Sequence, residues 1–414
     1  IRARAPAKRL SPASREFSFV RPTHKKQFGD SMLSNQASRN TRPTSRFVLG
    51  AITVASATSW CGAAQAESSV TLYGIADVGI EHINNTSTGG AQTREVSGNL
   101  SGSRWGLKGV EDLGAGMKAI FQLEDGFNIN DGTTAQSTKG LGSNAATTSR
   151  IFGRQAWVGL AYRGQQLTFG RQNSLFYEQA VAFDPMGASS RYSLLSLDYA
   201  AAARIDNSAK YTGVFGPLTA QAMYSTRYDT GYGAEVPGAQ LTGRFFSGAL
   251  TFAQGPLAAS VSYEQRNSNT VATNTGAERR ATAAASYAIG PVKGFAGYRY
   301  LQASNAFLPA NPIRLANGSE AGAANLYWAG AQYAVSPAFV VTATAYYQDV
   351  HSTSADPWLA VLCADYLLSK RTDIYATAGF ARNKGGSALG VNGYGTVAPD
   401  HNQTGVVIGM RQKF

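Results

Sequence analysis

Charged residues are scarce in this chain, and no long apolar run accompanies the shortage. Lys, Arg, Asp and Glu make up 15% of the 414 residues, against about 25% in an average globular protein. After Glu67, no stretch approaches the roughly 18 consecutive apolar residues that a membrane-spanning helix needs. A bundle of transmembrane helices is therefore excluded, and the low charge needs another explanation.

Cysteine is also scarce. The chain has two cysteines, Cys61 and Cys363. Cys61 lies in a segment that we expect to be removed on export, as argued below, so Cys363 is alone in the remainder. No disulfide can form within that part of the chain. A chain of this length can instead gain its stability from one large sheet.

The positive net charge of +12 is concentrated at the N-terminal end. Of the 37 basic and 25 acidic residues, 11 and 2 precede Glu67, so the rest of the chain carries 26 basic and 23 acidic residues. Both signs are scattered through this remainder, whereas a nucleic-acid-binding domain gathers its Lys and Arg on one patch. We expect no nucleic-acid partner.

The first 66 residues have the features of an export signal. The segment MLSNQASRNTRPTSR, which begins at Met32, contains three arginines and no acid, and the apolar run FVLGAITVASATSW follows it. Ala64-Gln65-Ala66 is then a small-x-small site of the kind that a signal peptidase cleaves. We expect residues 32–66 to be a secretory signal peptide, residues 1–31 to be a non-native or disordered extension, and residues 67–414 to form the folded body.

Segments in which apolar and polar residues alternate recur along the body. The final segment, GVVIGMRQKF, shows the pattern: the apolar residues at 406, 408 and 410 share the parity of Phe414, while Arg411 and Lys413 have the opposite parity. Successive side chains of a strand point to opposite faces of the sheet. Each segment therefore predicts a strand with one apolar and one polar face. Apolar spacing of the helical kind is not evident.

About sixteen such segments occur, and very short breaks alternate with long polar ones between them. An even, antiparallel, closed sheet places all short breaks at one rim, and lipid requires closure because unpaired backbone groups are costly there. The sequence therefore predicts an all-β, 16-stranded antiparallel transmembrane β-barrel. The predicted strands lie near residues 70–83, 100–113, 117–128, 150–161, 165–172, 204–214, 218–228, 240–254, 257–267, 279–289, 292–302, 323–335, 338–349, 358–369, 372–382 and 404–414.

One long connection differs from the others. Residues 173–203 are more apolar than the remaining long loops and include Phe176 and Phe183. Such a loop should pack against protein rather than extend into water. A barrel of about sixteen strands has a lumen too wide for wall side chains to fill. We therefore expect this third long loop to fold inward.

Several motifs together resemble the general porins of Gram-negative outer membranes, in the branch typical of β-proteobacteria. They are SSVTLYGIADVGI, GSRWGLKGVEDLGAGMKAIFQLEDGF, FGRQAWVGL with LTFGRQ, and the closing GVVIGMRQKF. The resemblance implies a homotrimeric channel of the outer membrane, reached through the periplasm and in contact with membrane lipid and lipopolysaccharide. It also implies that acids of the inward loop lie opposite basic residues of the wall.

The same motifs give candidate site residues. The resemblance implies wall arginines at Arg104 in GSRWG, Arg154 in FGRQAW and Arg204 in RIDNSAKY. Parity agrees if Trp105 and Trp157 meet lipid, since Arg104 and Arg154 have the opposite parity to these rings. The candidate constriction comprises Arg104, Lys108, Arg154, Arg204 and Lys210 on the wall and Glu178, Asp184 and Asp198 on the loop, with Phe414 as a C-terminal assembly anchor.

The predicted function is passive diffusion of small hydrophilic solutes and ions, with a mild anion preference. We expect no covalent chemistry, metal or cofactor. One alternative is a channel specific for sugars or phosphate. Another is an outer-membrane hydrolase that uses His82, His351 or His401 as a base. No G-x-S-x-G or H-E-x-x-H motif accompanies these histidines, so we do not expect an enzyme.

Overall fold

The computed structural model describes residues 68–135, 150–230, 233–304 and 322–414. The expected extension at 1–31 and the expected signal peptide at 32–66 lie outside these residues and stay predictions. In the described residues, no helix combines the length and the apolar character needed to cross a bilayer.

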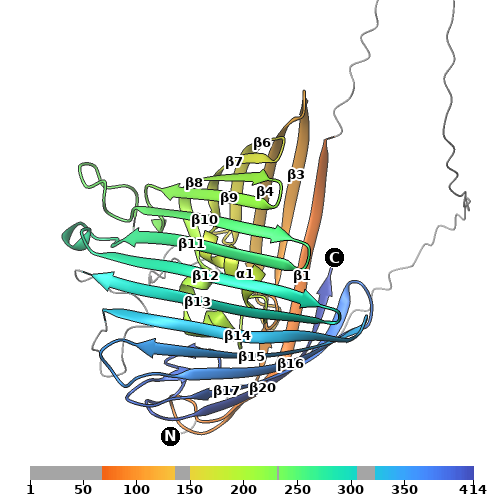
Figure 1. Cartoon of the computed structure of the whole chain (residues 1–414), viewed down its shortest axis with the longest axis vertical. Helices are drawn as coiled ribbons and strands as arrows, with labels where there is room; N and C mark the ends of the chain where they lie inside the picture. Colours follow the sequence, from red (N-terminus) through yellow and green to blue (C-terminus); the bar gives the residue numbers. More distant parts are fainter. Residues whose placement is uncertain (1–67, 136–149, 231–232, 305–321) are drawn as a thin grey trace, which may run out of the picture. The chain divides into compact units, whose positions relative to one another are not determined.

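Sixteen antiparallel strands form a closed barrel, which confirms the predicted fold (Figure 1). Each long strand pairs with its neighbours along the chain, and β20 closes the ring by pairing with both β17 and β1. The sixteen strands are β1 (Ser69–Ile83), β3 (Arg104–Gly114), β4 (Met117–Phe127), β6 (Gln155–Tyr162), β7 (Gln165–Asn173), β8 (Arg204–Phe215), β9 (Leu218–Ser225), β10 (Phe245–Gln254), β11 (Leu257–Asn267), β12 (Ala277–Ile289), β13 (Val292–Ser304), β14 (Ala323–Ser336), β15 (Phe339–Val350), β16 (Trp358–Leu367), β17 (Thr372–Arg382) and β20 (Gln403–Lys413).

Shorter elements lie in the long loops. Strand β2 (Gln92–Ser97) pairs with the end of β1, and β5 (Thr134–Ala135) pairs with the end of β4. Strands β18 (Leu389–Gly390) and β19 (Gly393–Tyr394) form a separate small hairpin. A 3-10 turn, η3, covers Val271–Thr273. The inward loop contains α1 (Leu175–Phe183), α2 (Leu194–Leu197) and the 3-10 turn η1 (Tyr199–Ala202).

The two rims of the barrel differ in their connections. At the short-turn rim, Gly216, Gly255 and Gly290 each precede a proline and have φ of +61°, +58° and +53°, which residues with a Cβ rarely adopt. The long connections lie at the opposite, long-loop rim. Predicted strand limits hold to within a few residues. Strand β10 starts at Phe245 rather than near 240 because Gly243, with φ of +68°, interrupts the extended backbone.

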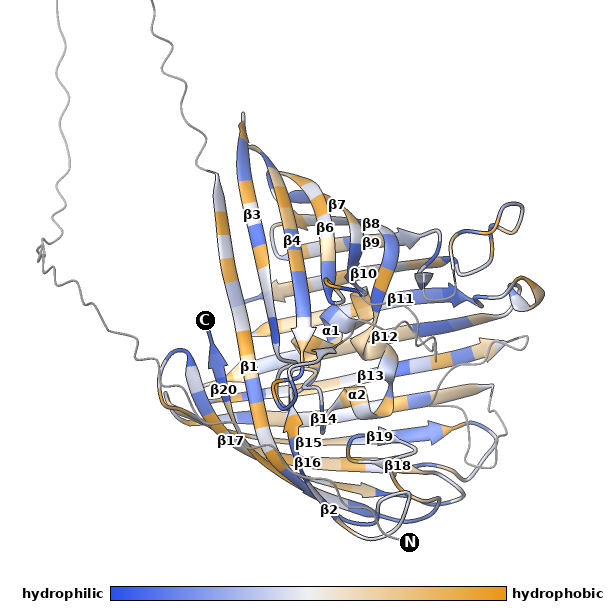
Figure 2. Cartoon of the chain, turned by 180° about the vertical axis from the view of Figure 1, so that it is seen from behind, coloured by the Kyte–Doolittle hydropathy of each residue, from blue (hydrophilic) through white to orange (hydrophobic). Residues whose placement is uncertain are grey.

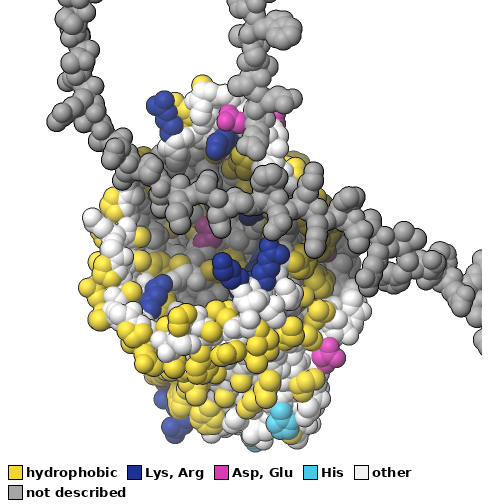
Figure 3. Space-filling model, turned by 90° about the vertical axis from the view of Figure 1, so that its right-hand side faces the viewer, with side chains coloured by type: hydrophobic (Ala, Val, Ile, Leu, Met, Phe, Trp, Pro, Cys, Tyr) yellow, Lys and Arg dark blue, Asp and Glu magenta, His cyan; other side chains and the backbone are white. Residues whose placement is uncertain are grey.

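The alternating pattern separates the two faces of the wall. On β1, Val70, Leu72 and Ile80 are 57% to 66% exposed on the outside, while Asp77 and Glu81 are fully buried on the inside. The strands in Figure 2 alternate in hydropathy along their length. Seen from the short-turn rim, the barrel end is hollowed and carries basic side chains around the hollow (Figure 3). The low overall charge follows from this wall, since one of its faces must be apolar.

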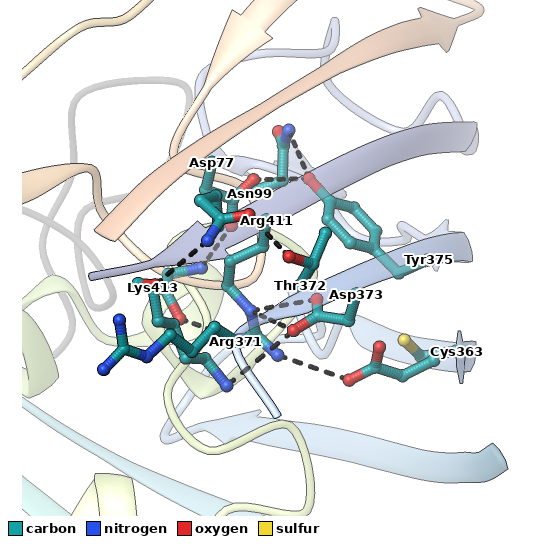
Figure 4. A network of polar contacts seen from close by, with 12 residues as sticks. Asp77, Asn99, Cys363, Arg371, Thr372, Asp373, Tyr375, Arg411 and Lys413 are labelled. Carbon is teal, nitrogen blue, oxygen red and sulfur yellow. Dashed lines mark hydrogen bonds and ion pairs between the residues drawn. The ribbon is translucent and has the colours of Figure 1, made fainter. Parts of the chain in front are cut away.

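A buried polar cluster joins the first and last strands of the barrel, β1 and β20, to β17 where the barrel closes (Figure 4). Arg411 on β20 donates from Nε to Asp373 on β17 at 3.0 Å and from Nη1 to Ser101 at 2.9 Å. The Tyr375 hydroxyl donates to Asp77 on β1 at 2.5 Å. The polar side of the last strand therefore faces the lumen, where Arg411 contacts residues of the neighbouring strand β17 and of the segment after β2.

Phe414 lies on the outer face, as its parity predicts, and is half exposed. Its backbone exchanges hydrogen bonds with Gly74 on β1 at 3.0 and 3.1 Å. The Phe414 ring packs over Gly74 in the space that a Cβ at this position would occupy. The terminal ring thus locks against the first strand. Its role as an assembly anchor stays a prediction.

We predict that Arg411→Met weakens the closed barrel. Removing one member of a buried ion pair costs about 3–5 kcal/mol. Asp373 is fully buried and would keep only the longer contact with the more exposed Lys413, at 3.7 Å, among its described basic neighbours. Urea unfolding of the barrel in lipid vesicles should show the loss. The matched control is Arg382→Met, an exposed arginine at the end of β17, which should change the unfolding free energy by under about 1 kcal/mol. Equal unfolding midpoints for the two variants would contradict the prediction.

Candidate pore constriction

The loop at 173–203 folds into the lumen, as predicted from its apolar composition. Ser174 begins α1 by accepting a hydrogen bond from the Tyr177 amide at 3.1 Å, which is the usual N-cap contact. The apolar side chains of the loop then form the core of the interior. Those that are 2% exposed or less include Leu175, Phe176, Phe183, Leu194 and Leu197.

Asp198 fixes one end of this loop to the opposite wall. Its carboxylate contacts Arg280 on β12 at 2.9 and 3.0 Å and Arg299 on β13 at 3.0 Å. All three side chains are at most 1% exposed. Burial by itself would raise the pKa of Asp198, but the two arginines outweigh burial and lower it. The ion pair therefore persists through the neutral and mildly acidic pH range.

Asp184 fixes the middle of the loop in another way. Its carboxylate accepts hydrogen bonds from the Tyr346 hydroxyl of β15 at 2.5 Å and from the amides of Met186 and Ala188 at 3.1 Å each. The Trp328 indole of β14 donates to the Phe183 carbonyl at 2.9 Å. Burial raises the pKa of Asp184 to about 6. The helix end is thus tied to β14 and β15.

A second long loop, residues 383–402, also enters the lumen. The Val391 carbonyl accepts from the Tyr192 amide at 3.3 Å and from the Ser196 hydroxyl at 2.8 Å. Val391 is fully buried, and Asn392 donates to Glu81 on β1 at 2.7 Å. The sequence analysis did not identify this contact. The segment is rich in glycine and polar residues, so its composition resembles that of an exterior loop.

Two adjoining cavities remain between the inward loop and the wall formed by β1, β3, β4, β6 and β8. Their volumes are about 330 and 400 Å³. Both are lined by Arg104 and Arg154 from the wall and by Tyr177 and Val181 from α1. Because they share these residues, the cavities meet at one neck. This neck is the candidate constriction.

Three of the predicted wall residues meet here. Arg104, Arg154 and Arg204 all line the 330 Å³ cavity, and no acid is among the described residues that line it. Arg204 stacks on the Tyr177 ring, with 4.7 Å between its guanidinium carbon and the ring centroid. Burial would raise the pKa of Tyr177, but these arginines outweigh burial and lower it. The arginines therefore set a strongly positive potential on this side of the neck.

Glu124 on β4 is the acid that balances part of this charge. It accepts from Arg154 Nε at 2.7 Å and lies 3.9 Å from Arg104 Nε. Burial by itself would lower the pKa of Arg154, but Glu124 and Tyr177 together outweigh burial and raise it. Glu124 was not among the site residues predicted from the sequence. Its even parity in the strand 117–128, opposite to that of the apolar Phe121 and Leu123, was the available signal.

The remaining predicted residues are divided. Lys210 on β8 pairs with Glu178 on α1 at 2.6 Å. Glu178 lines the second cavity, whereas Lys210 lines neither cavity. Lys108 is exposed to the lumen and lies 5.6 Å from the Tyr73 ring centroid. Asp184 and Asp198 do not line either cavity, contrary to our expectation for loop acids. Their carboxylates instead form the hydrogen bonds and ion pairs that hold the loop to the wall.

The parity argument for Arg154 was wrong, although the residue does line the neck. Trp157 lies directly opposite Gln122, which is an inward residue, so Trp157 faces the lumen and Val158 faces outward. Arg154 precedes β6 and reaches Glu124 from the loop. Its direction is therefore set by the approach of the loop and not by strand alternation.

A closed barrel with an apolar exterior and a charged, loop-narrowed interior defines the class of channel-forming membrane barrels. The chain belongs to the Gram-negative porin family, whose family model matches residues 51–386. It is an outer membrane protein that forms a water-filled channel for passive diffusion of small hydrophilic solutes and ions.

One relative and two solved structures are similar to this chain over most of its length. An outer membrane porin protein of Bordetella pertussis is 28% identical over 403 residues, covering 86% of this chain and 97% of the relative. Among solved structures, an anion-selective porin from Comamonas acidovorans is 25% identical with a TM-score of 0.70, covering 84% of this chain and all of that chain. A trimer form of OmpT, an outer membrane protein of Vibrio cholerae, has a TM-score of 0.57 at 15% identity, with 84% and 99% covered.

The anchoring of the loop should depend on pH through Asp184. Its pKa is raised from 3.8 to about 6, so its contribution to stability is complete below about pH 4 and is lost as pH rises through about 6. The difference in unfolding free energy between the wild type and Asp184→Asn should therefore favour the wild type more at pH 4 than at pH 7.5.

Substitution of Tyr346 tests whether Asp184 sets the pH at which this contribution is lost. Its hydrogen bond lowers the pKa of Asp184, so Tyr346→Phe should move the midpoint to higher pH. The measurement is unfolding over pH 4 to 8 for the wild type, Tyr346→Phe and their Asp184→Asn counterparts. A wild-type difference that does not vary over this range would refute the prediction.

Proposed function

We propose that the channel favours small anions and that Arg104, Arg154 and Arg204 carry this preference. The carrying observation is that the described lining of the 330 Å³ cavity contains these three arginines and no acid. The matched Comamonas acidovorans porin is itself described as anion-selective.

The mechanism is electrostatic sorting in a hydrated neck. The second cavity adds Glu124 and Glu178, but Glu124 is shared by two arginines and Glu178 is paired with Lys210. A solute that enters from either side therefore meets a net positive field. Charges that line a narrow passage act on ions without a fitted binding site, so transport needs no covalent step or cofactor.

The alternatives have less support. A sugar channel needs a track of aromatic residues inside the lumen, whereas most exposed tyrosines lie on the outer face. A hydrolase needs a base beside a nucleophile. His351 instead contacts Asn325, and His401 contacts the Pro399 carbonyl. His82 contacts the Thr93 hydroxyl at 2.7 Å but is exposed at the long-loop end of β1, and no acid among the described residues forms a hydrogen bond with it.

The outer face supports a homotrimer. Tyr, Trp and Phe mark the level where a barrel meets the lipid boundary. At the long-loop rim, outward rings occur on β9, β10, β11, β13, β14, β15, β16 and β17. They are Tyr224, Phe246, Tyr263, Tyr300, Tyr327, Tyr347, Trp358 and Phe380.

Strands β20, β1 and β6 carry no such ring at this rim in the described chain. Their outward residues are aliphatic, and Ile408, Ile80 and Val158 are each more than half exposed. A face that lacks boundary rings but is strongly apolar fits contact with other copies of the chain better than contact with lipid. We therefore place the trimer interface on this side and outer-membrane lipid, including lipopolysaccharide, along β9 to β17.

Removing charge from the neck should shift ion selectivity toward cations. One unit charge about 6 Å from an ion in water contributes roughly 0.7 kcal/mol, or about threefold in permeability. Arg204→Gln and Arg104→Gln should each lower the anion-to-cation permeability ratio by about that factor, measured as the reversal potential in a planar bilayer under a salt gradient.

Two matched variants make the selectivity test decisive. Glu178→Gln should shift the reversal potential in the opposite direction, since it removes a negative charge from the second cavity. Arg382→Gln, on the exposed end of β17, should leave it unchanged. An unaltered potential in both wall variants would overturn the assignment of the arginines.

A charge placed on the interface should separate the subunits. Val158→Lys on β6 and Val261→Lys on β11 alter valines of similar exposure, 59% and 52%. Each carries the same penalty on a lipid face, about 2–4 kcal/mol near the bilayer centre. We expect monomers for Val158→Lys and trimers for Val261→Lys by size-exclusion chromatography with light scattering in detergent. Trimers for both variants would contradict the proposed interface.

A further inference from the structure

The ring of aromatic residues at the long-loop rim is interrupted at β12. Ala281 occupies the position directly opposite Tyr263 on β11 and Tyr300 on β13. The next outward residue toward the rim is Arg279. From β9 to β17, β12 is the only described strand that presents no ring at this level. In this gap Arg279 lies between two strands, β11 and β13, whose tyrosines lie at the lipid boundary.

An apolar groove lies directly below this gap on the outer surface. Its volume is about 640 Å³. Small side chains form its floor, and Leu250 and Phe252 on one side and Tyr298 on the other are among its larger lining residues. The floor residues are Ala259, Ala283, Ala285 and Ala296, with the backbone of Gly297. The groove exists because β12 presents alanine at three successive outward positions, 281, 283 and 285.

Arg279 and the groove belong to one column of β12. Ala283 lies four positions after Arg279, which is about 13 Å along a strand. Gln265 and Gln302 flank Arg279 on the neighbouring strands. The Arg279 Nε donates to Gln265 at 3.0 Å, and its two Nη groups have no partner among the described residues. The guanidinium of Arg279 thus lies at the end of the apolar groove that is nearer the long-loop rim.

We propose that this column is a binding site for lipopolysaccharide of the outer leaflet. A lipid phosphate binds the free Nη groups of Arg279, with the Gln302 amide as a neighbouring donor, and one acyl chain of the same molecule lies in the alanine groove. Guanidinium is well suited to phosphate because it donates two parallel hydrogen bonds. Each methylene of an acyl chain that is buried in the groove adds to the affinity. The inference rests on the proposed lipid contact of β9 to β17.

The choice of occupant follows from where the charge lies. The long-loop rim of a porin faces the cell exterior, so Arg279 stands at the outer leaflet, where the lipid carries phosphates beside its acyl chains. A second copy of this chain is disfavoured as the occupant, because the site is flanked on β11 and β13 by tyrosines of the kind that lie at the lipid boundary. Arginine on an outer face is tolerated near the boundary but is costly deeper in the bilayer, which agrees with its place above the groove.

The test uses purified full-length wild-type protein, folded in detergent, and lipid A as the probe, with binding followed by native mass spectrometry. Arg279→Gln should weaken binding about tenfold. Ala283→Phe, which fills the groove, should weaken it by a similar factor. Lipid A from which the phosphates have been removed should bind the wild type as weakly as intact lipid A binds Arg279→Gln.

Matched controls separate this site from general effects. Arg382→Gln removes another exposed outer-rim arginine, and Ala329→Phe enlarges an outward alanine of β14 outside the groove; both should bind as the wild type does. Equal loss in Arg279→Gln and Arg382→Gln, or undiminished binding in both site variants, would overturn the proposal. Conductance should be unchanged in all four variants, so a failure of the channel assignment would be seen separately, in the wild type.

Discussion

Pairing of every backbone group in the wall is the constraint from which the rest of this structure follows. Lipid offers no hydrogen bonds, so the sheet must close, and β20 closes it by pairing with β1 and β17. Closure by strands makes each side chain face either lipid or the lumen. Many charged side chains of the wall are thereby directed inward, where ion pairs form at the seam around Arg411 and at the loop anchor around Asp198.

The interior charges serve two different purposes. One group is buried and fully committed to structure: Asp198 with Arg280 and Arg299 holds the inward loop, and little of it is exposed to a solute. The other group borders open space, as Arg104, Arg154 and Arg204 do. The buried ion pairs hold the loop in the position that leaves open space beside Arg104, Arg154 and Arg204. A loop held firmly on the β12 and β13 side leaves a gap of fixed width on the β3, β6 and β8 side.

The exterior is less uniform than its hydropathy suggests. Aliphatic residues cover β20, β1 and β6, rings border β9 to β17, and an alanine column with an arginine above it interrupts those rings at β12. These three surfaces have similar hydrophobicity but differ in side-chain size and in polar groups at the rim. They are therefore suited to different neighbours: other subunits, bulk lipid and an individual lipid molecule.

The sequence by itself determined the barrel, the strand positions and the inward loop, because alternation and turn chemistry are local and the wall has only two faces. It also identified Arg104, Arg154, Arg204, Lys210 and Glu178, partly through motif resemblance. Only the tertiary structure decided which charges remain at the neck. Asp184 and Asp198 are withdrawn by partners on β12, β13 and β15, Glu124 enters from β4, and residues 383–402 fold inward. Asp184, Asp198 and Val391 meet partners at least 82 positions away in the chain, and Glu124 meets Arg154 at a separation of 30. No local sequence pattern records such pairs.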